Sequence, residues 1–151
     1  MFGLVIYVGG CLIVATLVTF VHSMFRPVAS KGDSRSWRVL AAVFVLSITG
    51  PYGYVEVLTR SFGKTMKGAI EQGMIDAGIK GPMDYYKVTS YGGDTARIVA
   101  VAEEKQAWGG SDRPVVAMTL KKDGKFWQTA SFDVIFSDRL NRDRSTLPPF
   151  W

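Results

Sequence analysis

The first 25 residues contain no Asp, Glu, Lys or Arg, and the whole chain has one cysteine, Cys11, and one histidine, His22. A single cysteine excludes a disulfide framework within the chain and a cysteine metal site. A single histidine argues against a multi-histidine metal centre or a bis-imidazole haem. We expect Cys11 to be a small buried apolar residue and His22 to be a helix-end imidazole at the membrane interface. The alternative for His22 is a ligand supplied to a cofactor of a partner.

The uncharged stretch 1–25 predicts a transmembrane helix. More than 20 consecutive uncharged residues, at about 1.5 Å each, cover a hydrocarbon core of about 30 Å. A cleaved signal peptide is the competing interpretation, but it needs a basic start and a small-residue cleavage site. This chain starts without charge, and the stretch ends in His-Ser-Met-Phe-Arg-Pro. We therefore expect an uncleaved span over 1–25.

A second apolar segment, 39–59, carries one charge, Glu56, and a Gly50-Pro51 pair in its middle. A helix that stopped at Gly50 would be too short to cross a bilayer. Continued past Pro51, the segment is long enough, but proline removes a backbone donor and kinks or unwinds the helix. In lipid, that break is tolerated only where protein or water satisfies the freed carbonyls. We predict a kinked second span.

The residues around the Gly50-Pro51 break are also our candidate surface for contact with a partner. Small glycines permit close helix packing, tyrosines suit an interfacial depth, and an acid inside a span is normally paired. We expect Glu56 to lie near the interface with Arg60 as its i,i+4 partner, rather than in a proton path or against a partner's cofactor. The candidate contacts in this segment are Gly50, Pro51, Tyr52, Gly53, Tyr54 and Glu56.

The loop 26–38 between the two apolar segments is basic, with two lysine or arginine side chains on each side of Asp33. By the positive-inside rule it faces the cytoplasm or the mitochondrial matrix. A second basic cluster, Arg60, Lys64 and Lys67, follows the second apolar segment and so lies on the opposite side of the membrane. It weakens this inference. We expect a multi-pass inner-membrane protein, of a bacterium or a mitochondrion, whose C-terminal domain is periplasmic or in the intermembrane space.

Residues 60–151 are predicted to form one small α+β domain. Phe62, Met66, Ile70 and Met74 recur every four residues and mark one apolar helical face, and Gly78 and Gly81-Pro82 are stop signals. Gly68 and Gly73 weaken this helix but allow a neighbour to approach closely.

Four runs after the helix, over 85–91, 96–104, 114–122 and 125–136, are rich in β-branched and aromatic residues. The last two are joined through Asp123-Gly124, a strong hairpin signal. These runs predict an antiparallel β-meander packed on the helix. Because adjacent strand residues point to opposite faces, we expect Glu103 and Glu104 to be the solvated end of a strand rather than a catalytic pair.

The last stretch, 137–151, mixes arginines and aspartates and ends in Leu147-Pro-Pro-Phe-Trp151. One interpretation is that Phe150 and Trp151 fold back onto the domain. The other is a docking peptide, because a proline-stiffened segment loses little entropy on binding. Phe150 and Trp151 are therefore candidate partner contacts.

Four features follow one another in this chain: a span, an amphipathic helix, a turn at Gly81-Pro82 and a hairpin with Asp123-Gly124-Lys125-Phe126-Trp127. This order resembles that of the cytochrome c oxidase assembly factor 1 family. The domain of that family is similar to that of the small presequence-translocase subunit. The resemblance covers roughly residues 62–151 and implies a non-enzymatic membrane accessory. Members of the family typically have one span, whereas this chain has two candidates.

We therefore expect a non-catalytic protein that helps to assemble or stabilise a respiratory-type membrane complex by protein–protein contacts, in contact with a larger integral membrane complex and the lipid bilayer. A constitutive small subunit of a respiratory or photosynthetic complex is the alternative, and a membrane enzyme or transporter is less favoured. No catalytic, cofactor-binding or metal-binding residues are predicted, and no small-molecule substrate. Basic residues lie among acids in the domain, which argues against nucleic-acid binding.

Overall fold

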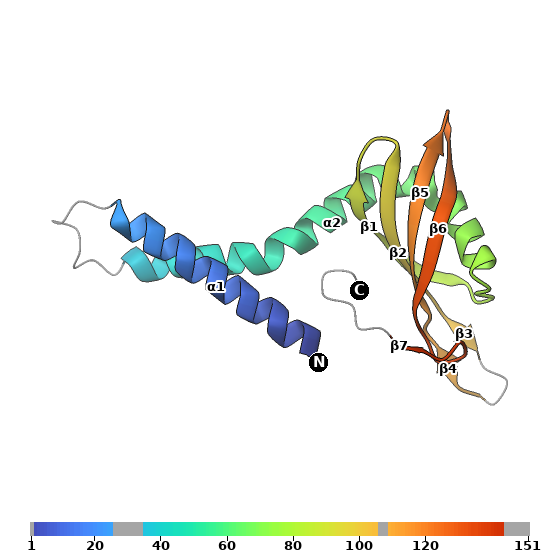
Figure 1. Cartoon of the computed structure of the whole chain (residues 1–151), viewed down its shortest axis with the longest axis horizontal. Helices are drawn as coiled ribbons and strands as arrows, with labels where there is room; N and C mark the ends of the chain where they lie inside the picture. Colours follow the sequence, from blue (N-terminus) through green and yellow to red (C-terminus); the bar gives the residue numbers. More distant parts are fainter. Residues whose placement is uncertain (1, 26–34, 106–108, 144–151) are drawn as a thin grey trace. The chain divides into compact units, whose positions relative to one another are not determined.

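The computed structural model describes residues 2–25, 35–105 and 109–143 (Figure 1). It is α+β, with two helices and an antiparallel sheet, as predicted. The elements are α1 (Phe2–Met24), α2 (Arg35–Asp76), β1 (Met83–Tyr91), β2 (Thr95–Ala102), β3 (Glu104–Lys105), β4 (Ser111–Asp112), β5 (Val115–Asp123), β6 (Phe126–Ser137) and β7 (Arg142–Asp143).

The chain divides into two compact units, residues 1–53 and 54–151. The first holds α1 and the start of α2. Both helices contain stretches, Leu4–Met24 and Trp37–Asp76, that are long and apolar enough to cross a membrane. Many apolar side chains of this first unit are exposed, among them Val5, Ile6, Leu17, Phe20 and Leu46.

Helix α2 is continuous over 42 residues and runs through Pro51 and on past Arg60. A kinked span over 39–59 and, after it, a helix with its apolar face from Phe62 to Met74 were expected, and the structure joins them into one helix. The junction stays helical because Val55 and Leu58 are buried and Thr59 makes a hydrogen bond to β1. The stretch from Tyr54 onward therefore packs as part of the second unit.

The sheet of the second unit has the strand order β1-β2-β5-β6-β7, and every neighbouring pair is antiparallel. The predicted hairpin is present, with Asp123 opposite Phe126 and Gly124 at a φ of 58°. A small hairpin, β3-β4, lies between β2 and β5 in sequence and forms its own two-stranded sheet. The β-meander is thus interrupted once, by this insertion.

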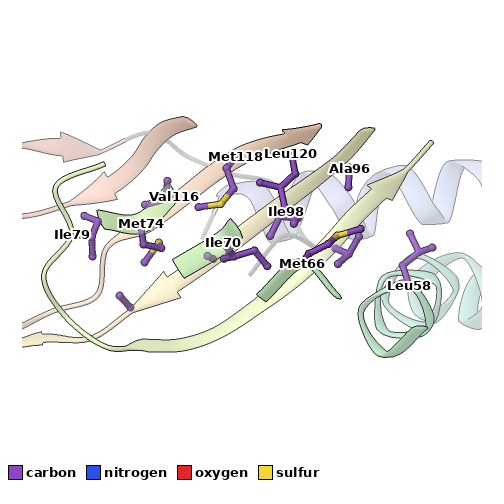
Figure 2. Packing of buried hydrophobic residues seen from close by; sticks show 13 residues of the cluster. Leu58, Met66, Ile70, Met74, Ile79, Ala96, Ile98, Val116, Met118 and Leu120 are labelled. Atoms are coloured by element: carbon purple, nitrogen blue, oxygen red, sulfur yellow. The ribbon is translucent and has the colours of Figure 1, made fainter. Parts of the chain in front are cut away.

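The core lies between the second half of α2 and one face of the sheet. Met66, Ile70 and Met74 are buried and point towards side chains of β2 and β5, as Figure 2 shows. The predicted apolar stripe is therefore the buried face, and each such side chain stabilises the fold by about 1.5–3 kcal/mol. Gly73 lies so close to β6 that an added Cβ would come within 2.7 Å of Thr129 Oγ1.

Candidate functional site

The proline break in α2 is covered by side chains of α1. Pro51 has no N–H, so the carbonyl of Ser47, four residues earlier, lacks its intrahelical donor. The Tyr7 hydroxyl lies 3.3 Å from this oxygen and donates to the carbonyl oxygen of Ile48 at 2.8 Å. The Cys11 thiol donates to Ser47 O at 3.4 Å. The oxygen freed by proline therefore has donors from within the chain.

Small and aromatic residues complete this contact between α1 and α2. Cys11 is buried, as predicted, and Ala15 one turn later is fully buried. The ring of Tyr52 meets the ring of Tyr7 edge-on, with the ring centres 6.2 Å apart. Tyr52 thus contacts α1, whereas the sequence had suggested only that its side chain lies at the depth of the membrane interface.

Gly50 and Gly53 do not pack against any other part of the described chain. A Cβ added at either position would meet no atom within 4 Å. On the same helix, Leu46 lies one turn before Gly50 and its side chain is exposed. This part of α2 therefore presents an open surface of small and apolar residues. Tyr54, the first residue of the second unit, is also exposed.

Glu56 is an ionic link between α2 and β1. Its carboxylate accepts from Arg60 Nε at 2.8 Å, the predicted i,i+4 pair, and from Lys87 Nζ at 2.6 Å. One turn further along, the Thr59 hydroxyl accepts the Val88 N–H at 2.9 Å. Sequence reasoning missed Lys87, because the local pattern around a strand lysine gives no indication of a distant helix.

Glu104 is buried, so the expectation that it is a solvated strand end is wrong. It accepts the backbone N–H groups of Lys80 and Gly81, and Arg139 Nε at 3.0 Å. Burial raises the pKa of this carboxyl, but the hydrogen bonds from Lys80 and Arg139 outweigh it, and the pKa of Glu104 lies below its ordinary value. The same arginine also donates to the carbonyl of Gly78 at 2.6 Å.

Asp112 forms a second buried carboxylate site beside the first. It accepts from the Ser137 hydroxyl at 2.9 Å and from the N–H groups of Asp138 and Arg139 at 3.2 Å each. Together, Glu104 and Asp112 tie the β3-β4 hairpin to the turn after α2 and to the end of β6. The groups that donate hydrogen bonds to Glu104 and Asp112 belong to the turn after α2 and to the end of β6, so these bonds hold the elements together. We call this arrangement of hydrogen bonds the brace. Within the described part of the chain, no group of three His, Cys, Asp or Glu side chains is placed to hold a metal ion.

A groove of about 1100 Å³ runs between α2 and β1 in the second unit. We call it the α2–β1 groove. The helix contributes residues from Thr59 to Ile75, and the turn and strand contribute Gly78 to Tyr86. No sequence pattern indicates this groove, because it depends on how far the helix lies from the edge of the sheet.

Three further residues were singled out from the sequence: His22, Phe150 and Trp151. His22 lies exposed in the last turn of α1. Phe150 and Trp151 lie outside the described residues.

Comparisons with known proteins gave no relatives: no family model, no curated protein and no solved structure matches this chain.

Proposed function

We propose that this protein is a non-catalytic integral membrane accessory that helps to assemble or stabilise a larger, respiratory-type membrane complex. The observation that carries the proposal is the apolar surface of the first unit. Side chains along α1 and the start of α2 are long, apolar and exposed, and Gly50 and Gly53 open onto empty space. Such surfaces are stable against lipid or against the helices of another membrane protein.

In this proposal α1 and the first half of α2 cross the membrane, with the basic loop 26–38 on the cytoplasmic or matrix side. The β-sheet domain then lies in the periplasm or intermembrane space. The hydrogen bonds from Tyr7 and Cys11 support a membrane location, because they satisfy a carbonyl that lipid could not. The open glycine surface on α2 is the docking face for a helix of the partner complex.

The experiment is purification of the tagged full chain in mild detergent, followed by identification and quantification of the proteins that come with it. We expect a large membrane complex, with this chain substoichiometric in the complex and lost as the complex matures. A fixed ratio that survives stringent detergent would instead identify a constitutive subunit. A monodisperse protein without partners would overturn the proposal.

A matched pair of variants locates the contact. Gly53→Ile fills the open surface on α2 and should reduce the recovered complex by about tenfold, the effect of roughly 1.4 kcal/mol. Gly68→Ile is the control, because Gly68 is a helix glycine of the second unit with equally open surroundings. Equal recovery with both variants would show that the glycine surface does not bind the partner.

A further inference from the structure

A basic surface on α2 follows directly after the apolar segment of that helix. Val57, Arg60, Lys64 and Lys67 are spaced by three, four and three residues, so they lie on one face of the helix. The side chains of Val57 and Arg60 are 63% and 80% exposed, and those of Lys64 and Lys67 are exposed as well. We call Arg60, Lys64 and Lys67 the basic patch. The function proposed above gives this patch no role.

The basic patch points away from the β-sheet. Leu58 and Met66 are buried in the core, and the Thr59 hydroxyl accepts the N–H of Val88 in β1. At 100° per residue these helix positions lie roughly opposite the basic patch. The contacts between α2 and the sheet therefore leave the patch exposed.

The basic patch keeps an excess of positive charge beyond its ion pairs. Lys67 pairs with Glu71 at 3.7 Å, and Arg60 and Lys87 share the carboxylate of Glu56. With the third residue of the patch, four basic side chains face two carboxylates, which leaves two positive charges in excess. The pairs of Arg60 and Lys67 lie at the surface, where such pairs contribute little to stability, so both side chains remain available to another anion.

The position of the patch along α2 suits the headgroup layer of a bilayer. Tyr54 and Val57 are exposed, and tyrosine is favoured where a span meets water. Arg60 and Lys64 follow Val57 by about 4.5 and 10.5 Å along the helix axis. The headgroup layer is about 5–8 Å thick on each side, and helical side chains lean towards the N-terminal end of their helix, which here is the apolar segment. Arg60 and Lys64 therefore reach the depth of lipid phosphates, and Lys67 lies at the outer rim.

We propose that the basic patch binds the phosphate groups of anionic phospholipids at the surface of the membrane. This inference rests on the proposed membrane location of α1 and the first half of α2. Guanidinium and ammonium groups donate charge-assisted hydrogen bonds to phosphate oxygens. Each such side chain near an anionic membrane surface favours binding by about fivefold. Lipid binding also accounts for basic residues on the side of the membrane where the positive-inside rule does not expect them.

The first test measures lipid binding to the full chain in mild detergent, by native mass spectrometry with added phosphatidylglycerol or phosphatidylcholine. Arg60→Gln combined with Lys64→Gln should weaken phosphatidylglycerol binding by about 25-fold, about fivefold for each charge. Lys121→Gln with Lys122→Gln is the matched control, because both lysines are exposed in β5, outside the basic patch, and should leave binding unchanged. Equal losses in the two double variants, or equal affinity of the unchanged chain for the two lipids, would overturn the proposal.

The second test follows the acetylation of single lysines after the full chain has been reconstituted in nanodiscs. Lys64 should react about fivefold more slowly in phosphatidylglycerol than in phosphatidylcholine, whereas Lys121 and Lys122 should react equally in both. Equal rates at Lys64 in a chain that nanodiscs retain would overturn this inference and leave the membrane location standing. A chain that nanodiscs do not retain would overturn both. Protection of Lys64 only in the complex with partner proteins would assign the patch to an acidic protein surface and overturn lipid binding.

Discussion

Replacing Tyr7 by Phe tests whether α1 stabilises the proline break in α2. The substitution keeps the ring that meets Tyr52 and removes the hydroxyl that serves the carbonyls of Ser47 and Ile48. Interhelical hydrogen bonds in membranes contribute about 0.6 kcal/mol on average and up to about 1.7 kcal/mol. An unsatisfied buried carbonyl costs about 1–3 kcal/mol. Because the Cys11 thiol remains near Ser47, we expect Tyr7→Phe to lower the free energy of unfolding by about 1–2 kcal/mol.

The same substitution in a Pro51→Ala background separates the hydrogen bond from packing. An alanine at this position supplies the N–H that the Ser47 carbonyl lacks, so the Tyr7 hydroxyl becomes less necessary. In that background Tyr7→Phe should cost about 0.5 kcal/mol, which leaves a coupling energy of about 1 kcal/mol between the two positions.

The assay is unfolding of the four proteins of the cycle with rising mole fractions of SDS in mixed micelles, followed by circular dichroism. Tyr54→Phe is the matched control, since Tyr54 is exposed and should tolerate the change within about 0.5 kcal/mol. Equal costs of Tyr7→Phe in the proline and alanine backgrounds would refute the reasoning. The Tyr7 hydroxyl would then act through its hydrogen bond to the Ile48 carbonyl and not through the Ser47 carbonyl.

Two further predictions concern the brace around Glu104. Because the pKa of this carboxyl in the folded protein lies below its ordinary value of 4.5, its contribution to stability is present above that pH and is lost as the pH falls through the folded pKa. Thermal unfolding between pH 7 and pH 3 should show a loss of stability below about pH 4.5 that is smaller in Glu104→Gln, and identical acid slopes would contradict this. Gly81→Ala should be destabilising by about 2–4 kcal/mol, because its Cβ would lie 2.2 Å from the backbone oxygen of Glu103. Gly78→Ala is not a suitable control, because Gly78 has a positive φ, whereas Gly68→Ala should be neutral or stabilising in the same unfolding assay.

Local periodicity accounts for most of the fold that the sequence predicted. The four-residue spacing from Phe62 to Met74 marks the buried face of α2, and the four β-branched runs coincide with β1, β2, β5 and β6. The Asp123-Gly124 turn is a local signal and forms the expected hairpin. The continuity of α2 was not predicted, because glycine and proline in a sequence usually mark the end of a helix. In the structure, the contacts of neighbouring residues keep the helix intact.

The candidate site was predicted less completely, because its contacts join residues far apart in the chain. Pro51 raised the question of which group would satisfy the freed carbonyl, but the position of Tyr7, some forty residues earlier, depends on the packing of two helices. Glu104 and Arg139 are separated by 35 residues, and nothing in the local pattern distinguishes them from solvated charges. Gly50 and Gly53 were expected to permit close packing, and within the described chain that space is open.

Helix α2 has a consequence for the order of events during synthesis. Its apolar face at Met66, Ile70 and Met74 is translated well before the strands that cover it, and roughly 50 residues separate Ile70 from Met118. At about 5–20 residues per second, this face remains without its partners for roughly 2–10 s after it is made. For that interval the nascent chain presents an amphipathic helix directly after an apolar segment. The unfinished chain therefore exposes an apolar face that the folded domain conceals.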